Sequence, residues 1–418
     1  MARILYINHY AGSERHGMEF RPFYLAREWQ SLGHEVCLVA ASFSHLRQEN
    51  PSLSAGEIRE EYVDRVRYVW LGTPRYEGNG LGRVRNMAGF VRGLYRNIER
   101  FAAERPDVVI ASSTYPLDVF PSARIARRVG GRLIFEVHDL WPLSPIELGG
   151  MSRWHPFIMA MQLGEDYACR RADNIVSILP HADRHLVTRG MDPERYLHVP
   201  NGIDLGAWQG TRDPIPTEHA TLLSRWREEQ RFVLGYTGAH GLLNHLELLL
   251  DAVRLLPRER FGIFMTGQGP EKANLIRQAQ ARQLHNVAFL PPVPKRTVPT
   301  LLAAADALYV GFAPQPLFRF GVSPNKLMDY MMSARPIVAA MRAGNDLVSE
   351  HGCGITVPPD DPRAVAAAVA KLAELPPAAR LQMGQRGRRA VEEHFTYPVL
   401  ARRFAQAFAG GAGSRKAA

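Results

Sequence analysis

The chain has 418 residues, of which 46% are hydrophobic and 22% charged, and its formal net charge is +10. This composition is typical of a folded protein of two or three domains, and no run approaches the roughly 18–20 apolar residues of a membrane span. The three cysteines are widely spaced and odd in number, which argues against a disulfide framework and fits a reducing cytoplasm. The first ten residues lack the apolar length of a signal peptide and predict a strand.

The excess of positive charge bears on the partners of the protein. Basic proteins attract nucleic acid, anionic membranes or phosphorylated ligands. The sequence contains no nucleic-acid-binding motif and no basic cluster with interleaved aromatic residues, so no nucleic-acid partner is expected. Only five of the 51 basic residues are lysines, which makes Lys326 one of few ammonium groups in the chain.

Short apolar stretches alternate with helical patterns along the chain, which predicts α/β domains with parallel sheets covered on both faces. A polar, proline-bearing stretch at 205–230 interrupts the alternation. We therefore expect two doubly wound domains, 1–204 and 231–392, joined by a linker at 205–230. The expected strands are 3–9, 35–41, 66–71, 107–111, 132–137 and 174–179 in the first domain, and 232–236, 261–266, 286–290, 306–311 and 336–340 in the second.

The loop after the first strand is a candidate ligand loop, because open α/β sheets bind ligands beyond the carboxyl ends of their strands. It contains Gly12 and Gly17, which permit close backbone approach to a phosphate, and Arg21 stands at the start of the next helix. An exposed flexible loop without a ligand is the alternative.

The loop after the strand at 132–137 begins with His138 and Asp139. A histidine beside an acid at a strand's carboxyl end is placed to orient a substrate hydroxyl. The alternative is a histidine that only caps the strand. Glu147, further along this loop, is a less specific second carboxylate.

Glycines also follow two strands of the second half. Gly238, His240 and Gly241 lie after the strand at 232–236, and Gly267 and Gly269 lie after the next one. Glycine turns between a strand and a helix can cradle a phosphate. Several such turns in one domain point to a phosphate site more specifically than any single one.

The stretch from 319 to 340 combines a turn at Gly321 and Pro324, a short helix and a strand. Lys326 in the first turn of the helix opposes the helix dipole unless an anion lies nearby. Asp329 lies on the same face of that helix. A cation for phosphate beside a carboxylate for sugar hydroxyls suits a nucleotide-sugar site, and a surface ion pair between the two is the alternative.

Residues 83–105 have apolar side chains at helical spacing, with Arg85, Arg92, Arg96 and Arg100 on the opposite side. A basic amphipathic helix of this kind can lie on an anionic bilayer. The alternative is that its apolar stripe packs on the domain core while the arginines are solvated.

Several segments together resemble the family 4 glycosyltransferases of GT-B fold, over nearly the whole chain. Val199–Asp204 reads VPNGID and resembles the family's VPNGVD segment, and Leu327–Val338 is similar to its LLEAMAxGxPVV segment. Residues 395–408 resemble the family's final helix, which implies a C-terminal helix at 393–410 that returns to the first domain. The opening of the chain and the segment GVSPNKLMDY most resemble the WbuB-type subgroup, which is associated with surface-polysaccharide assembly.

The resemblance implies that the second domain holds the donor and that the first mainly holds the acceptor. Asp329 would hold the ribose, the backbone near Gly238–Gly241 and the N–H groups of Lys326 and Leu327 would face the diphosphate, and His138 would face the transferred sugar. The expected catalytic residues are His138, Lys326 and Asp329; the expected donor contacts are Gly12, Gly17, Gly238, His240, Gly241, Val293, Pro294, Arg319, Asn325 and Leu327; the acceptor-side candidates are Arg21, Asp139 and Glu147.

The sequence departs from the family at two places. The family's first signature glutamate lies eight residues before the position of Asp329, and here that residue is Gly321. The usual Arg/Lys pair after the first strand of the second domain is also absent, and the loop has His240 and Asn244 instead. We expect Lys326, with help from Arg319, to stabilise the diphosphate in their place.

The expected function is transfer of a hexose-type sugar from a nucleotide diphosphate to a lipid-linked or saccharide acceptor, and UDP is the nucleotide favoured. The resemblance implies that the anomeric configuration is retained. The expected location is the cytoplasm, with peripheral contact at the inner face of the plasma membrane. No metal or other cofactor is expected, because Asp-x-Asp is absent and His181 and His185 lack an obvious third ligand. The alternatives are a nucleotide-sugar epimerase of the same fold and a non-catalytic partner subunit, which the glycine at 321 would explain.

Overall fold

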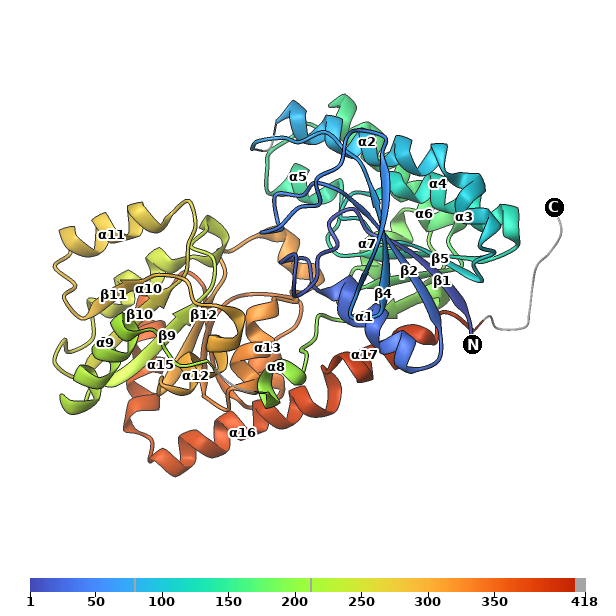
Figure 1. The fold of residues 1–418 in the computed structure, drawn as a ribbon. Coiled ribbons are helices and arrows are strands. Elements are labelled where there is room, and N and C mark those ends of the chain that lie inside the picture. Colours follow the sequence, from blue (N-terminus) through green and yellow to red (C-terminus); the bar gives the residue numbers. More distant parts are fainter. Residues whose placement is uncertain (79, 211–212, 410–418) are drawn as a thin grey trace. The chain divides into compact units, whose positions relative to one another are not determined.

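The computed structural model describes residues 1–78, 80–210 and 213–409, which form two compact units (Figure 1). Unit 1 comprises residues 1–200 and the chain from Tyr397 onwards, and unit 2 comprises Asn201–Thr396. Each unit is built around one sheet with helices on both sides, so the predicted α/β class with two parallel-sheet domains is confirmed. None of the helices in these residues is long and apolar enough to cross a membrane.

The sheet of unit 1 has eight strands in the order β3-β4-β2-β1-β5-β6-β7-β8. Every neighbouring pair is parallel except β3 and β4. The strand order reverses between β1 and β5, which is where doubly wound sheets bind ligands. The strands are β1 (Arg3–Ile7), β2 (Glu35–Ala41), β3 (Ile58–Val63), β4 (Val66–Leu71), β5 (Val108–Ala111), β6 (Arg132–Val137), β7 (Asn174–Ser177) and β8 (Tyr196–His198).

Two of these strands, β3 and β8, were not predicted from the sequence. β3 lies at the sheet edge and is largely exposed, so it lacks an apolar stripe, and β8 has only three residues. The helices of unit 1 are α1 (Arg21–Ser31), α2 (Leu81–Arg96), α3 (Ile98–Ala103), α4 (Val119–Val129), α5 (Leu143–Glu147), α6 (Pro156–Arg171), α7 (Asp183–Thr188) and α17 (Tyr397–Ala405).

The last helix, α17, packs on α1. The indole of Trp29 donates to the carbonyl of Ala401 at 3.1 Å, and its ring meets Phe404 edge-on at 5.0 Å. The predicted helix at 393–410 is therefore two elements: α16 (Pro377–His394) ends in unit 2, and α17 begins three residues later in unit 1. Residue 410 lies outside the described residues.

The sheet of unit 2 has six parallel strands in the order β11-β10-β9-β12-β13-β14. Alternate residues of β9 enter different cores: Val233 belongs to one buried cluster and Leu234 to the other. Both faces are thus covered, as a parallel sheet requires. The strands are β9 (Phe232–Thr237), β10 (Phe261–Thr266), β11 (Val287–Leu290), β12 (Ala307–Gly311), β13 (Ile337–Ala340) and β14 (Gly354–Val357). The helices between the first strand and α16 are α10 (Leu246–Val253), α11 (Lys272–Ala281), α12 (Val298–Ala303), α13 (Asn325–Met332), α14 (Leu347–Glu350) and α15 (Pro362–Glu374).

The stretch at 205–230, predicted to be a linker, lies within unit 2. Apart from residues 211–212, which lie outside the described part, it forms α8 (Gly206–Gln209) and α9 (Thr217–Glu228) of unit 2. Trp208, Leu223 and Trp226 are buried in the unit 2 core. Helix α9 was not predicted because its few apolar residues lie among charged and polar ones.

The basic stretch at 83–105 is not one helix, because it breaks at Asn97 between α2 and α3. Met87 and Leu94 of its apolar stripe are buried, which favours the core-packing alternative for that part. Ile98 and Phe101 further along the stripe are also buried, whereas Val84 is exposed and Val91 half-buried, so the stripe is incompletely covered only at these two positions. Arg100 forms an ion pair with Glu60 at 2.5 Å.

Candidate functional site

The ammonium of Lys326 lies at the carboxyl edge of the unit 2 sheet, beside the turn that follows β9. It donates to the hydroxyl of Tyr236 at 3.0 Å and to the side-chain carbonyl of Asn244, and it lies 4.8 Å from the centre of the Tyr236 ring. All these partners are neutral. Burial lowers the pKa of Lys326 to about 8. A half-buried cation with neutral partners favours an anion as its ligand.

Helix α13 is fixed to the end of β9 by Tyr330. The Tyr330 hydroxyl donates to the carbonyl of Thr237 at 3.0 Å and accepts the N–H of the same residue at 2.8 Å. This contact places Lys326, one turn earlier, over the turn. Asn325 is exposed at the helix start, whereas the Leu327 side chain is buried and its N–H donates to the Pro324 carbonyl at 3.1 Å. The N–H of Leu327 is therefore already bonded within the helix start.

The glycine turns after β9 and β10 are joined to each other. The N–H of Gly238 donates to Thr266 at 3.0 Å, and the N–H of His240 donates to Gln268 at 2.8 Å. Gly238 has φ +144° and Gly267 φ +149°, and a Cβ at Gly267 would lie 1.9 Å from the Gly238 carbonyl oxygen. Only glycine permits this approach. The structure thus brings the predicted phosphate turns together, with the Lys326 Nζ 3.4 Å from where a Gly238 Cβ would lie.

The side chain of His240 is buried under this turn, and Gly241 is half-buried at the start of the 3-10 helix η3 (Leu242–Asn244). Burial, with a smaller effect of Lys272, lowers the pKa of His240 to about 4, so the ring is neutral at pH 7. Within the described residues neither ring nitrogen has a hydrogen-bond partner. The backbone of His240, rather than its ring, joins the two turns.

Asp329 is paired with Lys295, not with Lys326. Lys295 Nζ lies 2.7 and 2.6 Å from the two carboxylate oxygens, and the indole N–H of Trp208 donates to the first of them at 3.3 Å. The surface ion pair within α13, considered as an alternative, is therefore wrong. Val293 and Pro294 lie immediately before the 3-10 helix η4 (Lys295–Thr297), which places them near Asp329.

Arg319 and Gly321 lie in the segment that leads to α13. Arg319 is exposed; it donates to the Pro316 carbonyl at 2.6 Å, and its guanidinium stacks 4.2 Å from the Phe320 ring. Gly321 ends the 3-10 helix η5 (Pro316–Phe320) with φ +97°. A glutamate at that φ would be strained, so the loop itself requires glycine at the position of the family's signature residue.

In unit 1, His138 follows β6 and rests on a buried polar network. Glu136, near the end of the strand, is fully buried and accepts hydrogen bonds from Arg21 Nε at 2.9 Å, from Tyr6 at 2.6 Å and from Ser112 at 2.7 Å. Burial alone would raise the pKa of Glu136, but Arg21 and His138 outweigh it and hold the pKa well below its usual range. Glu136 is therefore a permanent anion beneath the histidine.

This network determines the tautomer of His138. The single hydroxyl proton of Ser112 goes to the Glu136 carboxylate, so His138 Nε2, 2.9 Å from the same hydroxyl oxygen, must carry its own proton and donate. The other ring nitrogen, Nδ1, is the acceptor whenever the ring carries a single proton. Sequence reasoning missed Glu136, although a glutamate inside the apolar strand LIFEV was a readable signal.

The other unit 1 candidates are engaged within the unit. The side chain of Arg21 is fully buried, and besides Glu136 it donates to the carbonyls of Pro200 and Val199. While these bonds are kept, Arg21 cannot contact a sugar acceptor directly. Asp139 accepts from Ser144, Leu140 N–H and Trp141 of its own loop, and burial raises its pKa. Glu147 ends α5 and is half-buried.

Gly12 and Gly17 do permit close backbone approach, but to each other. A Cβ at Gly12 would lie 1.9 Å from the Gly17 carbonyl oxygen, and Gly12 N–H donates to Glu19 at 2.8 Å. Both glycines are buried, whereas Glu14, Arg15 and Met18 of the same loop are exposed. The place that a side chain at Gly12 would take is occupied by the backbone of the same loop. The close approach therefore gives no support for a contact with the donor.

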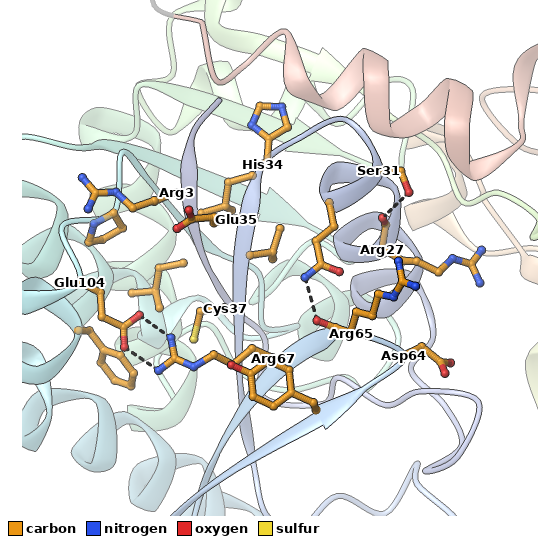
Figure 2. Close-up of a pocket in the computed structure, with 17 residues that line it drawn as sticks. Arg3, Arg27, Ser31, His34, Glu35, Cys37, Asp64, Arg65, Arg67 and Glu104 are labelled. Atoms are coloured by element: carbon orange, nitrogen blue, oxygen red, sulfur yellow. Dashed lines mark hydrogen bonds and ion pairs between the residues drawn. The ribbon is translucent and has the colours of Figure 1, made fainter.

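A cavity of about 970 Å³ lies at the opposite edge of the unit 1 sheet, at the amino ends of β1 and β2 (Figure 2). Two of its charged groups pair with each other: Arg67 makes two hydrogen bonds to Glu104, at 3.0 and 2.9 Å. The cavity is therefore unrelated to the groups that follow the carboxyl ends. No cluster of three or more potential metal ligands occurs in the described residues.

Comparisons with known proteins identify the family of the chain. Residues 16–202 match the family model of a glycosyl transferase 4-like domain, and residues 231–374 match the glycosyl transferases group 1. D-rhamnosyltransferase WbpZ of Pseudomonas aeruginosa PAO1 is 30% identical over 312 residues, which cover 70% of this chain and 77% of that protein. The chain belongs to the glycosyltransferases.

Two further similarities support this assignment. The probable glycosyltransferase WbjE of Pseudomonas aeruginosa is 24% identical to this glycosyltransferase over 383 residues, which are 90% of each chain. HepE of Anabaena, solved in complex with UDP and glucose, shares the fold with a TM-score of 0.67 at 15% identity, over 97% of this chain and 99% of that one. The glycosyltransferase thus has the GT-B fold, and it is an enzyme of the transferase class.

Proposed function

We propose that this glycosyltransferase binds a UDP-sugar through unit 2 and transfers the sugar, with retention of configuration, to a lipid-linked or saccharide acceptor in surface-polysaccharide assembly. The observation that carries the donor assignment is the Lys326 ammonium, which is held by the neutral Tyr236 and Asn244 beside the turn at Gly238. UDP is favoured because HepE binds it on the same fold. The WbuB-like opening of the chain supports the polysaccharide role.

The roles of the groups follow from charge. When the bond between the anomeric carbon and the phosphate oxygen breaks, UDP gains negative charge, and Lys326 with the surrounding backbone stabilises it without a metal ion. Arg319 is exposed in the same unit and is a further candidate cation. Asp329 holds the ribose, with Val293 and Pro294 beside the base. His138, fixed by Glu136 and Ser112, faces the transferred sugar. As the acceptor oxygen bonds to the anomeric carbon, its proton passes to the phosphate oxygen on which UDP departs.

A thermal-shift panel of UDP, GDP and ADP tests the donor assignment. A nucleotide at 100 times its Kd stabilises the protein by roughly 2.7 kcal/mol, and we expect this only for UDP. The shift should be lost in Lys326→Ala and kept in the control Lys371→Ala, whose side chain is exposed on α15. A shift with another nucleotide would refute UDP, and a shift that survives in Lys326→Ala would refute the role of Lys326.

Product analysis separates transfer from epimerisation. Incubated with UDP-sugar and no acceptor, a transferase leaves the sugar configuration unchanged, whereas an epimerase of the same fold isomerises it, which NMR detects.

Peripheral contact with the inner membrane face is a further part of the proposal, since α2 exposes Arg92 and Arg96. Exchange of both for Glu should abolish sedimentation with anionic vesicles; persistent binding would exclude α2 as the contact.

A further inference from the structure

A groove of about 560 Å³ lies in unit 1 between α2 and α6. Val84, Ala88 and Val91 line it on α2, and Phe157 and Ala160 line it on α6. Its volume falls within the roughly 300–1,000 Å³ of small-molecule sites. The groove is apolar and open to solvent: Met87 and Met161 in its lining are buried, whereas Val84 and Ala88 are exposed.

The surroundings of the groove are apolar and positively charged. Leu81 and Leu163 beside it are 76% and 66% exposed, and an exposed apolar patch of this kind marks a binding surface. Arg92 is the one charged residue among the described lining, and α2 contains arginines but no acidic residue. This combination is complementary to an amphiphile with a hydrocarbon chain and an anionic head group.

The buried side chains beneath the groove reach toward the carboxyl edge of the unit 1 sheet. Met87 and Met161 belong to one buried cluster with Tyr10, which follows β1. Trp141 packs against the same cluster, and its indole donates to Asp139, the neighbour of His138. One continuous set of side chains therefore joins the groove to the residues expected near the transferred sugar.

From these contacts we infer that the groove holds the hydrocarbon tail of a single lipid molecule, the acceptor, whose anionic head group lies against the arginines of α2. The inference rests on the proposed function and names its acceptor class, a saccharide carried on a lipid phosphate. A bilayer surface would cover only the exposed rim. Between the exposed Ala88 and the half-buried Ala160 the groove reaches the buried Met87 and Met161, and a single inserted chain can contact these two side chains.

Monododecyl phosphate, kept below its micelle concentration, is the probe for this site, and calorimetric titration measures its binding. We expect saturable binding of one molecule to the wild-type protein. Ala88→Trp fills the groove from an exposed position and should weaken binding at least tenfold, and Ala160→Trp should do so from the opposite wall. The control Ala378→Trp, exposed on α16 of unit 2, should bind like the wild type.

Two results would overturn the inference. One is unchanged affinity for the probe in both groove variants. The other is the absence of saturable probe binding while the protein still sediments with anionic phospholipid vesicles, which would assign the face to the bilayer. The UDP thermal shift of the same variants should stay as in the wild type. If UDP fails to bind the wild type, the proposed donor is wrong, while the probe titration still decides the groove.

Discussion

Lys295 contacts both carboxylate oxygens of Asp329, at 2.7 and 2.6 Å. The Asp329 side chain is 13% exposed and that of Lys295 47%, so the acid is fixed and the ammonium is open to solvent. A ribose diol that binds Asp329 must therefore share its oxygens with Lys295 or displace it. Both oxygens keep lone pairs for this purpose, since each carboxylate oxygen accepts more than one hydrogen bond.

Asp329→Asn should weaken uridine and UDP by the same factor, because the lost interaction is with the ribose that both ligands carry. Hydrogen bonds to a charged group contribute about 1.5–3 kcal/mol, which corresponds to roughly 10-fold to over 100-fold in Kd. Calorimetric titration with the two ligands measures this. Lys326→Ala is the matched comparison and should weaken UDP alone. An Asp329→Asn protein that binds uridine normally would contradict the ribose assignment.

UDP binding should weaken as the pH rises through about 8, the pKa to which burial lowers Lys326. Only the ammonium form attracts the diphosphate, so above this pH the apparent Kd should rise by roughly tenfold per pH unit. Titrations between pH 6.5 and 9.5 show the effect, with uridine, which lacks the diphosphate, as the control for titration of the uracil ring. Lys326→Met should have weak, flat binding. The same lowered pKa means that burying the cation destabilises the unliganded fold below pH 8, and that this effect is relieved as the pH rises toward 10.5.

Glu136→Gln should lower the free energy of unfolding by about 3–5 kcal/mol, because it leaves the fully buried Arg21 without its counter-charge. Chemical denaturation measures the loss. Glu99→Gln breaks an exposed ion pair with Arg128 in the same unit and should change stability by less than about 1 kcal/mol. Equal effects of the two substitutions would show that the Arg21–Glu136 pair does not stabilise unit 1.

Gly267→Ala should disrupt the donor turns, because its Cβ would lie 1.9 Å from the Gly238 carbonyl oxygen. We expect a stability loss above the roughly 1–2 kcal/mol of a left-handed alanine, together with loss of the UDP thermal shift. Gly33→Ala is the control: it has φ +85° and no atom within 4 Å of the place that its methyl group would take, so only the conformational cost applies. Normal UDP binding by Gly267→Ala would separate the turns from the donor site.

The inner strands of the two sheets were predictable. β2, β4, β6 and β10 are apolar runs bounded by turn residues, and they match the predicted ranges. Two peripheral elements, β3 and α9, were not predicted. β3 and α9 have few apolar residues, and their place depends on one face packing against a neighbour. The local sequence pattern does not show which neighbouring element a strand or helix will pack against.

The sequence alone determined the two α/β domains, the glycine turns and the presence of Lys326, Asp329 and His138 after the right strands, because periodicity and turn chemistry are local. Only the tertiary structure decided which groups meet. Lys326 turns to Tyr236 and Asn244, Asp329 meets Lys295 from 34 residues earlier, and Arg21 meets Glu136 across 115 residues. The side chain that satisfies a buried charge is chosen by packing in space, which sequence spacing does not encode.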